Sequence, residues 1–246
     1  MLEDILTMVR KEFKEIVHGS SKNKSAGVLR MLVPLFFAGV LLPSRVGSQY
    51  LTGFAPLAGL AWILPMVGIA LTVDSFAGER ERRTLETLLA SRLSDDAILL
   101  GKLCASVLYA WALMIGSLVL GAVVVNLTHP NGTLQFFSAP YAAGLVSFGL
   151  LTATAVCSIA VLVSLRAATV RQASQNLALG MMAVYFSLLF GFQALSRAQR
   201  VRLMAAVIGG QFTRNALFGL LLLVALDAVL LGAAKARFKR ARLILD

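Results

Sequence analysis

The residues best suited to specific chemistry form one short charged segment, which reads Gly-Glu-Arg-Glu-Arg-Arg-Thr-Leu-Glu-Thr-Leu-Leu-Ala over residues 78–90. Glu79 and Arg83 are four residues apart, as are Arg82 and Glu86, so ion pairs between their side chains can stabilise a short helix. The leucines of the segment give this helix an apolar edge: Leu85, Leu88 and Leu89. The segment can be a solvated charged loop, or it can dock as a helix into a groove on a soluble partner.

The residues after this segment predict the start of a long helix. Ser94 is a suitable N-cap, and Asp95 and Asp96 fall in a first turn, where the helix dipole favours acidic side chains. Gly101 and Lys102 follow, where an apolar stretch opens.

Asp227 is the second candidate for chemistry, because it lies within an apolar stretch near the end of the chain. An ionised carboxylate there costs several kcal/mol unless it is paired or hydrated, so it can contact a substrate or ion, or form a structural hydrogen bond between helices. Gln175 and Asn176 can likewise line a substrate pathway or bond to neighbouring helices. Asp74 lies near the end of its apolar stretch, where we expect it to reach Arg80 or water.

Composition defines the class of protein that must position these residues. The chain has 58% hydrophobic and 14% charged residues, against about 45 to 50% and 25% in soluble domains. This excludes a water-soluble core. The net charge of +11 does not indicate nucleic acid, because the basic residues lie between apolar stretches rather than on one patch. Cys104 and Cys157 are predicted to pack structurally.

The predicted fold is an all-α integral membrane protein with six transmembrane helices. Apolar residues recur at helical spacing from Leu2 to Val17, with charged residues on the other face, so residues 1–25 are expected to form an amphipathic helix in the membrane interface. Residues 26–246 form the membrane domain. Its apolar stretches each suit a bilayer of about 30 Å and cover residues 27–43, 54–77, 97–127, 140–165, 173–195 and 215–234.

The distribution of basic residues orients these spans. With the N-terminus in the cytosol, eighteen Lys and Arg residues face the cytosol and five face outward, as the positive-inside rule requires. Both termini, including the basic tail at 235–246, are then cytosolic, and the protein is expected to be a multi-pass protein of the cell membrane. Residues 196–213 contain an apolar run that is too short to cross, so we expect a re-entrant hairpin on the outer side. A seventh crossing would place the basic tail outside.

The segment from Glu79 to Lys102 resembles the signature of the ABC transporter type-2 permeases, in which E-R-E-x-x-T-x-E-x-L-L-A leads to a Gly-Lys pair that opens the next span. Ten residues fit: Glu79, Arg80, Glu81, Thr84, Glu86, Leu88, Leu89, Ala90, Gly101 and Lys102. Arg83 stands where the family often has Gly, and Arg92 where Pro is frequent. The interfacial helix, six spans and outer hairpin extend the resemblance over nearly the whole chain.

The resemblance implies the membrane subunit of an ABC exporter, in a homodimer with two separate ATP-binding subunits. It makes residues 79–90 a coupling helix, 2–17 an interfacial connecting helix and 196–213 an outer gate. The residues implied to contact the ATPase are Glu79, Arg80, Glu81, Arg82, Thr84, Glu86, Leu88 and Leu89. ATP and Mg²⁺ are expected on the partner, because Gly101-Lys102 lacks the upstream glycine of a phosphate-binding loop. No cofactor is expected on this chain.

Two rival functions follow from the same residues. A self-contained secondary transporter or channel would use Asp227 as an ion or proton site, but it leaves the 79–102 segment unexplained. A membrane enzyme would need a zinc-binding H-E-x-x-H pattern, paired carboxylates in a span or a Ser-His arrangement, and the sequence shows none of these.

Overall fold

Helices form all the regular structure in the part of the chain that the computed structural model describes, which is residues 2–18, 32–82, 84, 93–208 and 212–238. Six of them are long and apolar enough to cross a membrane. The prediction of an all-α membrane protein with six spans is therefore confirmed. The candidate spans are Leu32–Tyr50, α4 Ala55–Glu81, α6 Asp95–Thr128, α7 Ala139–Ser164, α8 Val170–Ala194 and Leu217–Arg237 within α10 Phe212–Arg237.

The first span ends later than the sequence predicts. It contains a π-helical turn, η1 Phe37–Leu41, followed by α3 Leu42–Val46 and the 3₁₀ turn η2 Gly47–Tyr50. Pro43 does not end the span at residue 43, because the chain stays helical through it: Pro43 lies at the start of α3, directly after the π-helical turn. Gly47, with a φ of 66°, ends α3 instead.

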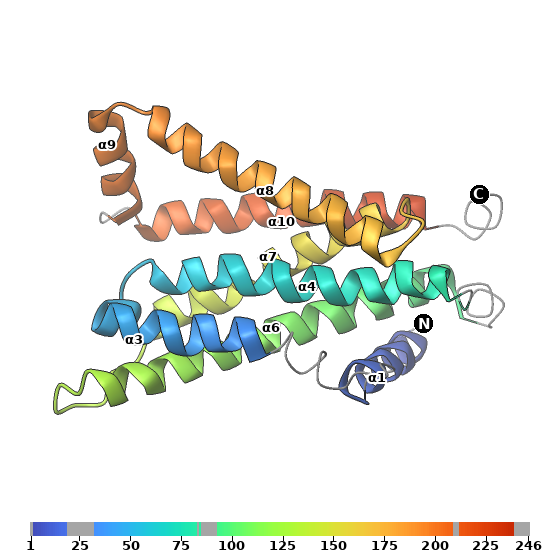
Figure 1. Ribbon diagram of the computed structural model, residues 1–246, viewed down its shortest axis with the longest axis horizontal. Helices are drawn as coiled ribbons and strands as arrows, with labels where there is room; N and C mark the ends of the chain where they lie inside the picture. Colours follow the sequence, from blue (N-terminus) through green and yellow to red (C-terminus); the bar gives the residue numbers. More distant parts are fainter. Residues whose placement is uncertain (1, 19–31, 83, 85–92, 209–211, 239–246) are drawn as a thin grey trace.

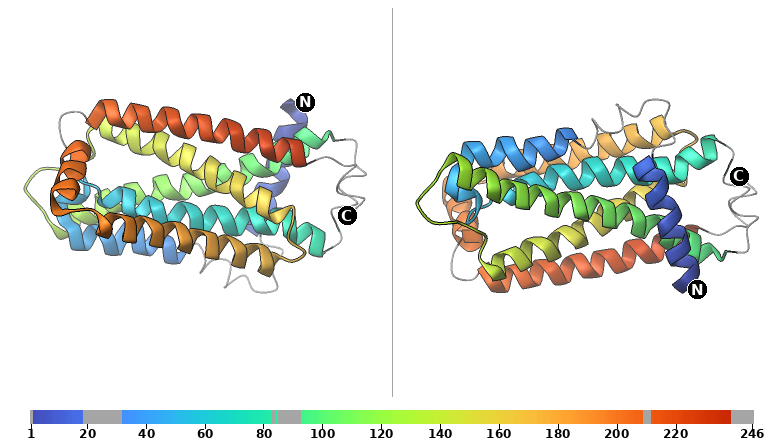
Figure 2. Two further views of the ribbon diagram at one scale, coloured as in Figure 1. Left: turned by 90° about the horizontal axis from the view of Figure 1, so that it is seen from above. Right: turned by 90° about the horizontal axis from the view of Figure 1, so that it is seen from below.

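The spans form an elongated bundle whose two ends differ. Helix α1 Leu2–His18 lies across one end of the bundle, and we call this the α1 end (Figures 1 and 2). The opposite end, which carries α9 Arg197–Ile208, is the α9 end. Helix α1 packs on α6, because its apolar face buries Met8 against Gly101. The amphipathic pattern predicted for residues 1–25 therefore positions a helix against the bundle.

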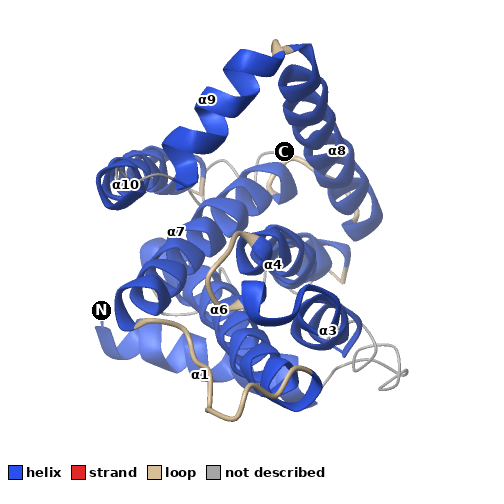
Figure 3. Ribbon diagram, turned by 90° about the vertical axis from the view of Figure 1, so that its left-hand side faces the viewer, coloured by secondary structure: helices blue, strands red, loops and turns tan. Residues whose placement is uncertain are grey.

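Helices α4, α6 and α7 make the centre of the bundle. Their buried side chains form one hydrophobic cluster, which includes Leu64, Leu103, Met114 and Val161. Helices α8 and α10 lie at the periphery (Figure 3). In α8, only Ala173 and Leu177 are buried. The centre of the bundle is thus rigidly packed, while the last two spans are attached at its edge.

The segment predicted as an outer hairpin contains one helix, α9, in its described residues. The side chains of Ser196 and Gln199 cap the start of α9 reciprocally, each accepting a hydrogen bond from the other's backbone N–H, at 3.0 and 3.3 Å. Helix α9 crosses from the end of α8 toward the start of α10 (Figure 1). The reciprocal cap starts a regular helix at Arg197, and the outer re-entrant hairpin over residues 196–213 stays a prediction.

Candidate functional site

Lys102 is the centre of a buried polar cluster at the α1 end. Its side chain is 1% exposed, and its Nζ lies 2.8 Å from Oε1 of Glu12 and 2.8 Å from Oε1 of Glu79. The same ammonium donates to the carbonyl and hydroxyl oxygens of Ser75, at 3.0 and 3.2 Å, and lies 5.7 Å from the ring centroid of Phe76. A buried lysine is stable only when its charge is paired and its protons are bonded. These contacts meet both conditions.

Glu12 carries the cluster onto α1. Its second oxygen, Oε2, accepts a hydrogen bond from the Ser75 hydroxyl at 2.9 Å. Burial by itself would raise the pKa of Glu12, but the ammonium of Lys102, the hydrogen bonds from Lys102 and Ser75, and the charge of Lys11 together lower that pKa below its usual value. Glu12 is therefore an ionised residue that fastens α1 to both α4 and α6.

Glu79 and Lys11 extend the cluster toward solvent. The Lys11 ammonium lies 3.4 Å from Glu79 Oε1, 3.5 Å from Glu12 Oε1 and 3.2 Å from Glu15 Oε1. Burial would lower the pKa of Lys11, but the three carboxylates raise it overall. The other oxygen of Glu79, Oε2, is buried and has no hydrogen-bond partner among the described residues.

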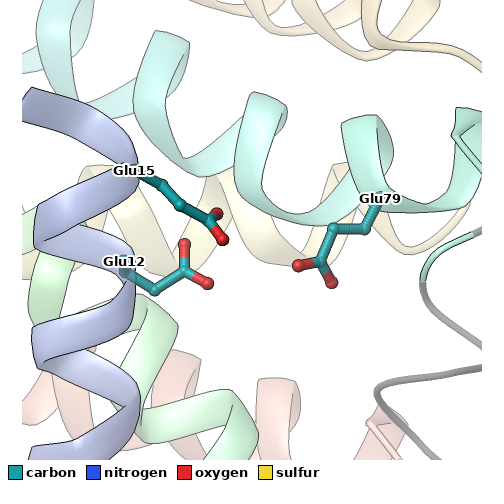
Figure 4. Close-up of side chains that lie close together, drawn as sticks. All are labelled: Glu12, Glu15 and Glu79. Carbon is teal, nitrogen blue, oxygen red and sulfur yellow. The ribbon is translucent and has the colours of Figure 1, made fainter. Parts of the chain in front are cut away.

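The three carboxylates also have the spacing of a metal site. Figure 4 shows Glu12 and Glu15 on α1 and Glu79 on α4, with oxygens of all three within 4.8 Å of one another. Lys102 and Lys11 already place two ammonium groups against these oxygens. We therefore interpret the cluster as an ion-pair network rather than a metal centre.

The close contact between α1 and α6 explains why a glycine, Gly101, precedes the buried lysine. A Cβ at this position would lie 2.5 Å from the Cβ and 2.7 Å from the Cγ of Met8. Only glycine lets α1 approach α6 this closely. The Gly101-Lys102 pair thus has two roles in one contact, since the glycine admits α1 and the lysine binds it.

The next two residues of the charged segment connect to a different part of the bundle. Arg80 donates from a guanidinium nitrogen to the carbonyl of Ala167 at 3.3 Å. Glu81 accepts from the backbone N–H of Val170, the first residue of α8, at 3.1 Å. A carboxylate at that position also suits the positive end of the α8 dipole. The triplet Glu79-Arg80-Glu81 therefore links the end of α4 to α1 and α6 on one side, and to the α7–α8 connection on the other. We call this the junction.

The remaining described residues of the segment complete the end of α4. The side chain of Asp74 is 60% exposed and pairs with Arg82 at 3.1 Å, so of the two expected partners, Arg80 and water, it reaches solvent and not Arg80. The reason is that Arg80 is used by Ala167. Thr84 is exposed, and both its N–H and its hydroxyl donate to the carbonyl of Glu79, at 2.9 and 3.3 Å. The chain that leaves the junction is thus anchored to it.

The structure brings together only part of the predicted coupling set. Glu79, Arg80 and Glu81 form the last turn of α4, and Arg82 caps it. Glu86, Leu88 and Leu89 lie outside the described residues, so their role in a coupling helix stays a prediction. Glu79 is 8% exposed and paired inside the cluster. It therefore holds the segment to the bundle and offers little surface to a partner.

The substrate-pathway candidates lie elsewhere, on α8 and α10. Asp227 is 5% exposed, and neither of its carboxylate oxygens has a hydrogen-bond partner among the described residues. Gln175 and Asn176 are exposed on α8. The structure does not bring these residues into the Lys102 cluster, so they are separate candidates.

Sequence reasoning missed Glu12, Ser75 and Lys11 as members of the site. It placed Glu12 on the polar face of an interfacial helix, where it would need no partner. The signal that was available is Lys102, because a lysine inside an apolar stretch requires a carboxylate partner from another segment. Which carboxylate that is depends on how α1 crosses α6, and the sequence does not show it.

Comparison with known proteins agrees with the signature. The family described as ABC-2 family transporter protein matches residues 11–243 of this chain. That match spans the junction, the six apolar helices and α9. Comparison with curated proteins found no match.

Proposed function

The chain belongs to the ABC-2 transporter family as a permease subunit of an ABC transporter, and from this premise we propose that it is the membrane subunit of an exporter driven by ATP-binding subunits on separate chains. The proposal includes a homodimer of this chain with two ATP-binding subunits, a place in the cell membrane and cytosolic termini. ATP and Mg²⁺ would be bound by the partner. Under this proposal the α1 end faces the cytosol and the α9 end faces outward.

The strongest support for coupling through residues 79–90 is the junction. Its residues, Glu79-Arg80-Glu81, are the first three of that segment and connect it to several helices. A force on the segment would act on the end of α4. Through Glu79 it would reach Lys102 on α6, and through Lys102 it would reach Glu12 on α1, because the Lys102 ammonium lies 2.8 Å from a carboxylate oxygen of each glutamate. Through Arg80 and Glu81 it would reach the start of α8. Alternating access needs this kind of connection between a moving partner and several spans.

The proposal assigns different tasks to the predicted coupling residues. Glu79, Arg80 and Glu81 transmit movement within this chain. Thr84, Glu86, Leu88 and Leu89 contact the ATPase, since an apolar edge on a charged segment suits a groove on a soluble partner. Arg82 holds the end of α4 through Asp74.

Co-purification with the ATP-binding subunit tests this assignment. A Leu88→Asp change places a charge on the apolar edge, and we expect it to abolish co-elution of the two chains in detergent. The matched control is Leu134→Asp, because Leu134 is 80% exposed in the loop between α6 and α7, at the opposite end. Loss of co-elution in Leu88→Asp alone supports the proposal. Equal behaviour of both variants, with the complex intact, would refute docking through residues 79–90.

Asp227 supports a second role within the same function. A buried carboxylate without a partner in a span is a candidate for contact with a cation or a polar group of the substrate, and Gln175 and Asn176 remain candidates for the same pathway. If the purified chain transports without any ATP-binding subunit and Asp227→Asn stops it, the self-contained transporter built on Asp227 replaces the exporter proposal.

A further inference from the structure

The exposed side of α6 is a single apolar stripe. Every exposed residue of this helix from residue 101 to residue 127 is apolar, and each lies three or four positions from the next, which places them all on one face. The first part of α6, from Asp95 to Val107, has no exposed residue. We call the exposed set the α6 stripe, and its members are Leu108, Ala112, Gly116, Val119, Val123 and Leu127.

The length of the α6 stripe matches the thickness of a membrane. Its ends, Leu108 and Leu127, are 19 positions apart, which is about 28 Å along an α-helix. The hydrocarbon core of a bilayer is about 30 Å thick. The stripe therefore suits contact with acyl chains over its whole length, and Leu127 lies at the boundary of this hydrocarbon core at the α9 end.

The loop that follows α6 has two halves of different character. It covers residues 129–138 and joins α6 to α7 at the α9 end (Figure 1). The first half, residues 129–133, is exposed and mostly polar. In the second half, Leu134 is 80% exposed, the largest value among the large apolar side chains that the structure describes, and Phe136 is 66% exposed. The two halves thus suit different surroundings.

Asn126, in the last turn of α6, holds the second half of the loop beside that helix. Its Oδ1 accepts a hydrogen bond from the backbone N–H of Gln135, and its Nδ2 donates to the carbonyl of the same residue, both at 2.8 Å. Asn126 directly precedes Leu127, where the α6 stripe ends. Residues 134–136 therefore lie level with the end of the stripe.

The side chains of the second half face alternately toward the bundle and away from it. Gln135 and Phe137 are partly buried. The alternate residues, Leu134 and Phe136, are exposed, as along an extended chain, whose successive side chains lie on opposite sides. The ring of Phe137 packs on that of Tyr50, with centroids 6.0 Å apart. The backbone is thus fixed at two inward residues, and the two apolar side chains between and before them are held outward.

The charge pattern indicates what these outward side chains contact. The sequence contains no Asp, Glu, Lys or Arg between Lys102 and Arg166, so the loop offers no ionic group to a soluble partner. Aliphatic and aromatic side chains lower their free energy by leaving water for acyl chains, and aromatic residues favour the membrane interface. An uncharged loop with two outward apolar side chains, level with the end of the α6 stripe, therefore suits a lipid surface.

We propose that residues 134–136 form a membrane anchor at the α9 end, in which Leu134 and Phe136 insert between lipids at the boundary of head groups and acyl chains. The polar half of the loop stays in water. Because the anchor has no charge, it inserts equally into neutral and anionic lipid. The anchor belongs to this chain and needs no ATP-binding subunit.

Spin-label accessibility in phosphatidylcholine vesicles tests the proposal. Leu134→Cys, Phe136→Cys and Asn131→Cys are made one at a time in the full chain carrying Cys104→Ala and Cys157→Ala, and each new thiol is labelled with a nitroxide. Oxygen concentrates in the bilayer, whereas a nickel chelate stays in water. We expect the ratio of oxygen to nickel collisions to be several-fold higher at positions 134 and 136 than at position 131. Asn131 is the matched control, because it is exposed in the same loop.

Three outcomes would overturn the proposal. If positions 134 and 136 collide with nickel as often as position 131, the second half of the loop lies in water. If both reagents are excluded from positions 134 and 136, another protein covers them, and spin–spin broadening would identify a second copy of the chain. If the oxygen preference requires phosphatidylglycerol in the vesicles, the contact depends on charge, which an uncharged anchor does not explain.

Fluorescence keeps the test valid if the chain without its two cysteines does not fold. Phe136→Trp and Asn131→Trp leave both cysteines in place, and lipids brominated near the head group quench a tryptophan that contacts the membrane. Phe136→Trp should add quenched emission to that of Trp62 and Trp111, whereas the emission that Asn131→Trp adds should be unaffected. Equal quenching of the added emission in the two variants would contradict the proposal.

Discussion

The ammonium of Lys102 on α6 lies 2.8 Å from a carboxylate oxygen of Glu79 on α4, and the lysine is 1% exposed. The contact joins the two ends of the family signature, which are 23 positions apart in the sequence. Glu79 lies in the last turn of α4, and Lys102 lies in α6, which begins at Asp95. The ion pair thus joins the two helices that flank the segment that we propose to contact the ATPase. Glu12 connects α1 to the same ion pair.

Removal of the central charge should destabilise the bundle strongly. Lys102→Met leaves the carboxylates of Glu12 and Glu79 buried without their main partner, and breaking a buried pair in this way costs about 3–5 kcal/mol. We expect a large fall in the midpoint of thermal unfolding in detergent. Adding Glu12→Gln and Glu79→Gln to Lys102→Met should recover most of the loss, because no buried charge is then unpaired. A triple variant no more stable than Lys102→Met would mean that the network does not act as a unit.

Gly101→Ala should separate α1 from α6. The added Cβ would lie 2.5 Å from the Cβ of Met8, so one helix must move away. We expect faster proteolysis within α1 and a lower unfolding midpoint. Gly116→Ala on the same helix is the matched control, because a Cβ at Gly116 meets no atom within 4 Å. Equal sensitivity of the two variants would count against the close contact.

Attachment of α1 should weaken at acidic pH, because Glu12 then loses its negative charge. The pKa of Glu12 in the folded chain is lowered from its usual 4.5, so its contribution to stability is complete above about pH 4.5 and is lost as the pH falls through the lower folded value. Measured from pH 7 downward, unfolding midpoints of wild type and Glu12→Gln should differ most at neutral pH and converge in acid. The exposed residue Glu3 provides the control, since Glu3→Gln should leave the wild-type profile unchanged. A constant difference at all pH values would show that ionisation of Glu12 is not the cause.

Glu81→Ala should loosen the start of α8 with little effect on the rest. Glu81 accepts the N–H of Val170, and loss of such a cap costs about 1 kcal/mol. Hydrogen exchange should therefore rise in the first turn of α8 and stay constant in α6. Under the proposed function, the same variant keeps its ATPase partner but couples hydrolysis to transport less efficiently. Unchanged exchange at Val170 would contradict the role of Glu81 in the junction.

The Asp227→Asn variant distinguishes a functional role of the Asp227 carboxylate from a structural one. Both oxygens of Asp227 lack partners among the described residues, so removal of the charge should not lower the unfolding midpoint. We expect transport to fall while stability is kept or raised. A large loss of stability would instead identify a structural bond to a neighbouring helix.

Much of the fold was predictable because the bilayer imposes simple rules on sequence. Spans must be long and apolar, so the six stretches were found with their ends displaced by a few residues, except where Pro43 was accommodated within α3 and the first span continued to Tyr50. The cap of α6 was predictable for a similar reason. Ser94 accepts the N–H of Ala97 at 3.2 Å, and this contact depends only on residues three apart.

The candidate site was less predictable, because its members come from three helices that only folding brings together. The signature marked Glu79, Gly101 and Lys102 as important but gave no reason for their types. The sequence also suggested Arg83 as the partner of Glu79, since it considered pairs within one helix. In the structure the described partners are Lys102 and Lys11, from other elements.

The sequence by itself determined the membrane class, the number of spans, the family and the absence of acidic residues between Asp96 and Asp227, because each of these depends on residue types and local spacing. The tertiary structure alone decided that α1 crosses α6 at Gly101, that Glu12 completes the pairing of Lys102, and that α8 and α10 diverge toward α9 (Figure 1). The physical reason is that a buried charge requires a partner of opposite sign without specifying its position in the chain. Only the packing of helices determines which carboxylate comes within 3 Å.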